Sequence, residues 1–281
     1  MPDGNPGAAR MISSLPRGVA DFVRALTVAE PVVAVRLGGS RGGETAQPQD
    51  GSRDWDLLVY MQGALEDLSR AEVPGLTDVT PIASPFIVGE CVIEANRDVM
   101  DCAFIHVTML AQSARSSASG EFRLHPMVRA AAGMPSYVLE AEAALSVPLS
   151  GAVDVAAEPP ATLVAAGVPW WRGRAALALH MAEDSLYLGD AATTAGFVAA
   201  TAACLAHAEA LADGWYLPSK RFLAHGRDPL LAHALRAALG ADRLASARSL
   251  RDFGAERGLT REAALQWAAD GREEGPWSPR S

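Results

Sequence analysis

The sequence has few cysteines, few aromatic residues and no excess of positive charge. Its 281 residues include three cysteines, and no two of them form a Cys-x-x-Cys pair. An odd number of widely separated cysteines is typical of reduced thiols in the cytoplasm and argues against a disulfide framework. We therefore expect a cytoplasmic protein in which Cys91, Cys102 and Cys204 are reduced.

Basic residues are too few for binding that depends on phosphate charge alone. The 24 Lys and Arg residues are outnumbered by 33 Asp and Glu residues, which gives a net charge of −9. Non-specific nucleic-acid binding needs Lys and Arg to neutralise phosphates, so we do not expect nucleic acid as a partner. The same charge is compatible with a single nucleotide held through a divalent cation, which brings its own positive charge.

Long apolar segments are also lacking by our reading. The N-terminus is rich in Gly, Pro and Asp and has no signal-like apolar core, and we expect no helix that spans a membrane. What the sequence does contain is a hydrophobic fraction of 49%, which is enough to build a sizeable core.

The most informative stretch begins with a short apolar run that two glycines end. Val32 to Leu37 is rich in β-branched residues and predicts a buried strand. Gly38 and Gly39 follow it, and glycine allows positive φ and the close approach of a ligand to the backbone. If a helix begins at Ser40, its first N–H groups form a favourable site for phosphate.

A second apolar run opens with two acids at alternate positions. In a strand, Asp54 and Asp56 share one face and Trp55 takes the other. Two carboxylates on one face repel each other unless a cation lies between them. A hard divalent cation such as Mg²⁺ suits such oxygen ligands.

These residues resemble a known signature. Gly38-Gly39-Ser40, then thirteen residues, then Asp54-Trp55-Asp56-Leu57 is similar to the signature of the DNA polymerase β-like nucleotidyltransferase superfamily, whose smaller members include antibiotic adenylyltransferases. That family has a third acid on a later strand, and Asp101 matches it inside an apolar run. The resemblance covers roughly residues 30 to 108.

The resemblance implies a role for each of these residues. Asp54 and Asp56 would bridge two Mg²⁺ ions, and Asp101 would bind the catalytic ion and help to deprotonate an acceptor hydroxyl. Two such ions, roughly 4 Å apart, stabilise the attacking and leaving oxygens of a transferred phosphoryl group. The Gly39 amide and the Ser40 hydroxyl would hold the β- and γ-phosphates of a nucleoside triphosphate, ATP being the expected one. Arg41 would assist by its charge.

A second segment resembles part of the helical domain of the antibiotic adenylyltransferases. It runs from Asp213 to Leu223 and contains Lys220 shortly after a proline. The resemblance implies that this lysine reaches the triphosphate, where an ammonium group would neutralise phosphate charge. The alternative is an ordinary helix end followed by a surface lysine.

The predicted helix from Trp170 to Leu188 offers further candidates. Glu183 or Asp184 could act as the general base in place of Asp101, but a structural pair between His180 and Asp184 is the favoured reading. Arg174 and His180 also fit the Arg-x5-His spacing of some helical ribonucleases, which leaves the three acids unexplained. Trp215 and Tyr216 either stack on a base or belong to the core.

The pattern and the resemblance together predict an α+β fold, in which an α/β nucleotidyltransferase domain with a mixed sheet is followed by an all-α helical bundle domain. The predicted boundaries are a disordered tail over 1–12, the nucleotidyltransferase domain over 13–150, a linker over 151–168, the bundle over 169–270 and a tail over 271–281. Within the first domain we expect a hairpin around Gly89-Glu90 and a helix over Pro126 to Leu145 that breaks near Gly133.

These predictions lead to a Mg²⁺-dependent nucleotidyltransferase that moves a nucleoside monophosphate, AMP from ATP, onto a hydroxyl of a small acceptor. An aminoglycoside-like compound is one candidate, because a net charge of −9 favours a cationic acceptor. The alternative is a non-catalytic or antitoxin-like partner protein that keeps the fold and binds nucleotide. The sequence does not indicate the oligomeric state.

Overall fold

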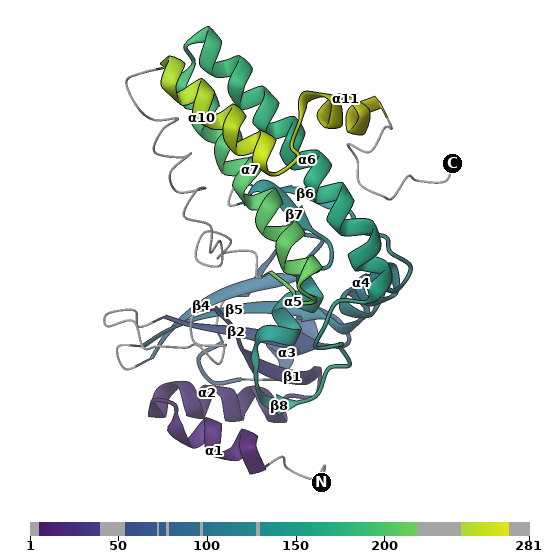
Figure 1. The fold of residues 1–281 in the computed structure, drawn as a ribbon. Helices are drawn as coiled ribbons and strands as arrows, with labels where there is room; N and C mark the ends of the chain where they lie inside the picture. Colours follow the sequence, from purple (N-terminus) through teal and green to yellow (C-terminus); the bar gives the residue numbers. More distant parts are fainter. Residues whose placement is uncertain are drawn as a thin grey trace. The chain divides into compact units, whose positions relative to one another are not determined.

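The computed structural model describes residues 6–39, 54–71, 73–76, 79–95, 98–127, 130–217 and 243–269. The fold is α+β, with a mixed sheet and a helical C-terminal region (Figure 1). The chain divides into two compact units: residues 1–114 with 139–157, and residues 115–138 with 158–281.

The first unit is built on a six-stranded sheet. The strand order is β3-β4-β5-β2-β1-β8, and β2 and β5 are the parallel pair in an otherwise antiparallel arrangement. The strands are β1 Val32–Leu37, β2 Asp54–Met61, β3 Thr80–Pro81, β4 Gly89–Ala95, β5 Asp98–His106 and β8 Val147–Gly151. The helices of this part of the chain are α1 Pro6–Ser14, α2 Arg17–Val28, α3 Leu65–Arg70, α4 Val107–Ala118 and α5 Val138–Leu145.

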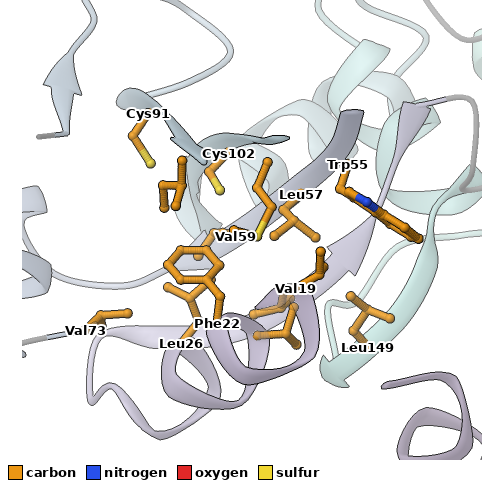
Figure 2. Close-up of a cluster of buried hydrophobic side chains, with 14 of the residues drawn as sticks. Val19, Phe22, Leu26, Trp55, Leu57, Val59, Val73, Cys91, Cys102 and Leu149 are labelled. Atoms are coloured by element: carbon orange, nitrogen blue, oxygen red, sulfur yellow. The ribbon is translucent and has the colours of Figure 1, made fainter. Parts of the chain in front are cut away.

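One face of this sheet forms the hydrophobic core with α2. Val19, Phe22, Val23 and Leu26 recur at the spacing of one helix face, and all four are buried. They pack against alternate residues of the central strands, among them Trp55, Leu57, Val59, Cys91 and Cys102 (Figure 2). Burying side chains of this size stabilises the fold by about 1.5–3 kcal/mol each. Alternate apolar residues of β1, β2, β4, β5 and β8 therefore lie on this face.

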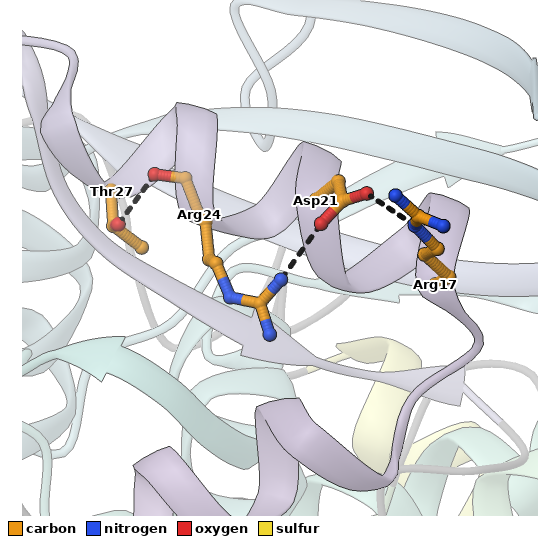
Figure 3. A network of polar contacts seen from close by, with 4 residues as sticks. All are labelled: Arg17, Asp21, Arg24 and Thr27. Carbon is orange, nitrogen blue, oxygen red and sulfur yellow. Dashed lines mark hydrogen bonds and ion pairs between the residues drawn. The ribbon is translucent and has the colours of Figure 1, made fainter.

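The outer face of α2 is polar. Asp21 lies between two arginines of the same helix, with 2.8 Å to Arg24 and 3.6 Å to Arg17 (Figure 3). The Thr27 hydroxyl donates a hydrogen bond to the carbonyl of Arg24 at 2.8 Å. Exposed pairs of this kind contribute at most about 1 kcal/mol, so burial of the other face fixes this helix.

The second unit is centred on a long helical hairpin. Its helices α6 and α7 are joined by Gly189 in the left-handed conformation (φ 79°) and by Asp190, whose side chain accepts a hydrogen bond from the Thr193 amide at 3.0 Å. A left-handed Gly followed by an Asp N-cap ends one helix and starts the next. The elements of the second unit are β6 Leu124–Met127, β7 Ala130–Pro135, α6 Ala161–Leu188, α7 Ala191–Ala212, α10 Arg243–Glu256 and α11 Arg261–Ala269.

A buried aromatic network ties α6 and α7 to the chain before them. The Trp171 indole N–H donates to the Tyr137 hydroxyl at 2.8 Å, and that hydroxyl lies 3.1 Å from Nδ1 of His207. The indole can only donate, whereas the direction of the hydrogen bond between the tyrosine hydroxyl and His207 depends on the imidazole tautomer. The His207 ring also stacks on Trp171 with centroids 4.4 Å apart.

Removing the tyrosine hydroxyl should cost more than its size suggests. Tyr137→Phe leaves the Trp171 indole N–H and His207 Nδ1 buried without this partner, and each such group costs about 1–3 kcal/mol. We expect the free energy of unfolding to fall by about 2–5 kcal/mol in urea denaturation. The control is Tyr187→Phe, because Tyr187 is 60% exposed and should change stability by less than about 0.5 kcal/mol.

His207 should also give the fold a measurable pH dependence. Full burial lowers its pKa from 6.5 to about 3, so between these values the unfolded chain binds a proton that the folded chain does not. Stability is therefore present above the unfolded value and is lost as the pH falls through this window. Between pH 7 and pH 5, this group alone should remove about 2 kcal/mol. His207→Gln keeps an acceptor for Tyr137 and should flatten that loss; equal pH dependence in both proteins would contradict the account.

Two segments of the first half differ from expectation. A helix over Pro6–Ser14 replaces most of the predicted disordered tail, because its Ile12 packs against the hydrophobic core. The predicted hairpin around Gly89-Glu90 is wrong, since both residues lie inside β4, which pairs with β5. Gly89 is needed there for close packing: a Cβ would lie 2.8 Å from the Leu65 side chain.

The helix predicted over Pro126 to Leu145 is also wrong in its first half. That half forms β6 and β7, and only Val138–Leu145 is helical. Gly133 has φ 82°, and a Cβ on it would lie 2.9 Å from Leu124, so the pairing of the strands requires glycine. The predicted linker ends too late as well, because α6 begins at Ala161 and continues through Pro169.

One further expectation needs correction. By length and apolar composition, α7 could cross a membrane, which we did not expect from the sequence. Of its most apolar window, 61% is buried inside the protein, where α7 packs on α6. A helix in the core of a protein passes this test as readily as a membrane span.

Candidate functional site

The two acids of β2 lie on the sheet face opposite the hydrophobic core. Asp54 is exposed and Asp56 is half-buried, whereas Trp55 between them is buried in the core (Figure 2). This alternation follows the period of a strand and confirms that the two acids share a face. We call this side of the sheet the acidic face; Asp54, Asp56 and Asp101 define it.

The third acid joins them through strand register. β2 and β5 run parallel, and Asp56 is paired directly with Asp101, while Asp54 is paired with Val99. Residues paired across neighbouring strands point to the same side of the sheet. On the far side of β5, Asp101 is paired with Val92 of β4, which is 67% exposed. All three acids therefore lie on the acidic face of the first unit.

The glycine turn lies directly against one of these acids. Gly39 has φ 61°, and a Cβ placed on it would be 1.7 Å from Oδ2 of Asp56. The amide of the preceding Gly38 donates a hydrogen bond to the backbone carbonyl of Asp56 at 2.8 Å. Any other residue at position 39 would occupy the space of the carboxylate. The sequence signature therefore corresponds to one local contact, between the end of β1 and the start of β2.

A hydrogen bond on the core side holds the acidic ends of β2 and β5 together. The Trp55 indole N–H donates to Oδ1 of Asp98, the first residue of β5, at 3.2 Å. Sequence reasoning missed Asp98, because only the register shows that it lies beside the signature tryptophan. This bond links the strand that carries Asp54 and Asp56 to the strand that carries Asp101.

The described part of the chain contains no group of three His, Cys, Asp or Glu side chains placed closely enough to hold a metal ion. The donor chemistry nevertheless suits Mg²⁺, because carboxylate oxygens are the ligands that it prefers. The glycine turn gives the Asp56 carboxylate the space that a Cβ at position 39 would take. The predicted phosphate-binding residues Ser40, Arg41 and Lys220 lie outside the described residues.

Further along the same face, the sheet carries an arginine and a tyrosine that the sequence did not single out. Arg36 is paired with Leu58, and its guanidinium donates to the hydroxyl and the carbonyl of Ser146, both at 2.7 Å. Burial raises the pKa of Tyr60, whose hydroxyl has no hydrogen-bond partner within the described chain. Both positions alternate with core residues, so period-two counting along β1 and β2 could have placed them on this face.

The candidates on α6 have structural partners in the second unit. His180 pairs with Asp184 at 3.6 Å, which confirms the reading that was favoured for them. Burial raises the pKa of Glu183, although the charges of Arg251 and His180 act to lower it.

The two remaining alternatives also involve residues of the second unit. Arg174 lies over the ring of Trp170 at 5.5 Å, so it has a partner other than His180. Tyr216 is 1% exposed and belongs to the core, as the second reading for it predicted. Trp215 packs against the buried residues Ala206, Ala210 and Leu217.

Comparison with protein-family models and with curated proteins finds no match for this sequence. Among solved structures, the chain is similar to the crystal structure of a nucleotidyltransferase-like protein from Exiguobacterium sibiricum 255-15. The identity is 12%, the TM-score is 0.38, and the match covers 98% of this chain and 83% of that chain.

Proposed function

We propose that the protein is a Mg²⁺-dependent nucleotidyltransferase that transfers a nucleoside monophosphate, AMP from ATP, to a hydroxyl of a small molecule. The observation that carries the proposal is the contact of Gly39 with the Asp56 carboxylate, on the strand where Asp56 is in register with Asp101. Two adjacent glycines pack against one acid, and two further acids lie on the same face. This arrangement suits the binding of a polyphosphate and its cations better than it suits the stability of the fold.

Each residue of the acidic face has a proposed task. Asp54, Asp56 and Asp101 would hold the Mg²⁺ ions. Bound Mg²⁺ would supply the positive charge that stabilises the attacking and leaving oxygens. The Gly39 amide and the Ser40 hydroxyl would bind the β- and γ-phosphates, with Arg41 and Lys220 adding positive charge. Asp101 is also the proposed base for the acceptor hydroxyl, because it is in register with a metal-binding acid.

The acceptor is proposed from charge alone. The acidic face carries Asp54, Asp56 and Asp101, and Glu90 and Glu94 are exposed on the same side of β4. A cationic, hydroxylated molecule such as an aminoglycoside-like compound would be attracted to it. We place this reaction in the cytoplasm, where ATP and Mg²⁺ are available.

One observation favours a second candidate, a non-catalytic or antitoxin-like partner protein that binds nucleotide. The described residues do not form a ready group of three metal ligands. A protein that uses the same turn to hold a nucleotide without turnover would not need one. The two candidates differ in whether pyrophosphate is released.

The test is pyrophosphate release by the full chain with ATP, Mg²⁺ and a panel of hydroxylated acceptors, some cationic and some neutral. The enzyme predicts release that depends on both Mg²⁺ and one class of acceptor. A parallel titration with a fluorescent ATP analogue measures binding. Saturable binding without pyrophosphate release from any acceptor would favour the partner protein, and absence of both would reject the two candidates together.

A further inference from the structure

Two of the three cysteines face each other across neighbouring strands. Cys91 of β4 is paired directly with Cys102 of β5, and both side chains are buried in the core beneath the acidic face (Figure 2). Both side chains belong to the same cluster of buried residues. Cys204 is buried in the other compact unit, where its thiol contacts Arg174.

The spacing of directly paired strand residues suits a covalent bond between these sulfurs. Cα atoms of opposite residues in an antiparallel pair are about 4.5–5.5 Å apart. Disulfides form where Cα atoms are about 4.4–6.8 Å apart. The bond therefore needs rotation of two side chains and no large movement of the backbone. A pair of buried thiols that only filled space would not need to be in register.

We propose that Cys91 and Cys102 form a site of oxidative modification, at which a peroxide converts the dithiol into a cross-strand disulfide. The inference does not depend on the proposed function. Cys91, which is 5% exposed, is the sulfur that a molecule as small as hydrogen peroxide reaches first; Cys102 is fully buried. Cys102 then resolves the oxidised sulfur, because it lies directly opposite Cys91 on the neighbouring strand.

The chemistry balances with peroxide as the oxidant. The Cys91 sulfur attacks one peroxide oxygen, the O–O bond breaks, and one water molecule leaves, so that Cys91 becomes a sulfenic acid. The Cys102 sulfur then attacks the Cys91 sulfur, the S–O bond breaks, and the hydroxyl leaves as water with the proton of Cys102. Two thiols and one peroxide thus give one disulfide and two water molecules.

The product would tie β4 to the strand that carries the third acid. Cys102 follows Asp101 directly in the chain, and Cys91 precedes Val92, which is paired with Asp101. Oxidation would therefore place a covalent link immediately beside the acidic face, on its core side.

The sequence offers a direct assay, because trypsin separates all three cysteines. Cleavage after Arg70, Arg97 and Arg115 places Cys91 in peptide 71–97 and Cys102 in peptide 98–115, while Cys204 lies in a later peptide. The full folded chain is treated with hydrogen peroxide, quenched with catalase, alkylated under denaturing conditions and digested. We expect loss of two of the three thiols, a mass decrease of two hydrogen atoms, and peptides 71–97 and 98–115 joined in the monomer. Reduction should restore all three thiols.

The variants separate this site from general oxidation. Cys204→Ala should still form the linked peptide, whereas Cys91→Ala and Cys102→Ala should not. Wild-type protein that keeps three thiols, gains oxygen on either cysteine without forming the linked peptide, or links them only between two chains would overturn the proposal. The decisive digest uses wild-type protein. The proposal can therefore be contradicted even if a variant fails to fold.

Discussion

Asp56→Asn is expected to lower the rate of nucleotidyl transfer by about a hundred- to a thousandfold, the usual effect of removing one group that stabilises charge in the transition state. Asparagine keeps the shape of the side chain but loses the negative charge that would hold a cation. The substitution also removes repulsion from Asp54 and Asp101 on the same face. The measurements are pyrophosphate release and thermal unfolding of both proteins.

Glu90→Gln is the matched control for this prediction. Glu90 is exposed on the same side of the sheet, and its loss also removes one negative charge. Glu90 is proposed to add only to the charge that attracts the acceptor and to bind neither metal nor phosphate, so the activity of this variant should stay within about twofold of wild type. Equal losses in the two variants would mean that only the total charge of the face matters, and the assignment of Asp56 would fail.

Gly39→Ala should be the second most damaging change. The new Cβ would lie 1.7 Å from Oδ2 of Asp56, 2.5 Å from its Cγ and 2.9 Å from its Cβ. Rotation of the Asp56 side chain about its Cα–Cβ bond would remove the first two contacts but not the third, so either the turn or the strand must shift. We expect a loss of activity of about a hundredfold, as misplacement of reacting groups by about 1 Å produces. Stability should fall by about 2–5 kcal/mol from strain and overpacking together.

Gly258→Ala separates backbone strain from displacement of the acid. Gly258 has φ 66°, close to that of Gly39, but a Cβ there would meet nothing within 4 Å. It should therefore lose about 1–2 kcal/mol of stability from its left-handed backbone and keep full activity. If both variants keep activity, the contact between the turn and Asp56 has no part in the reaction.

The sequence predicted the acidic face well because strands repeat every two residues. Alternation placed Asp54 and Asp56 together and Trp55 in the core, and the isolated Asp101 inside an apolar run indicated a neighbouring strand. The spacing of the buried residues of α2 is an equally local pattern. Register did not follow, because it depends on contacts far apart in the chain. The pairing of Asp56 with Asp101 and of Cys91 with Cys102 could be seen only in the fold.

Wrong predictions occurred where tertiary packing decided the conformation. The Ala-rich segment before Pro135 has helical composition, yet Gly133 and two prolines suit the strands that form there. Gly89 was interpreted as a turn residue, although it is a strand residue that lets Leu65 pack closely. At these positions glycine allows two segments to approach closely. The sequence alone does not distinguish this role of glycine from a role in a bend of the chain.

The most direct test of the central claim is a crystal structure of the full chain with Mn²⁺ and a non-hydrolysable ATP analogue. Manganese takes the place of Mg²⁺ among oxygen ligands and is located by its anomalous scattering. The account predicts manganese coordinated by the carboxylates of Asp54, Asp56 and Asp101, with the triphosphate against Gly39. A bound nucleotide whose metal contacts none of these carboxylates, or Asp101 directed away from the other two, would contradict it.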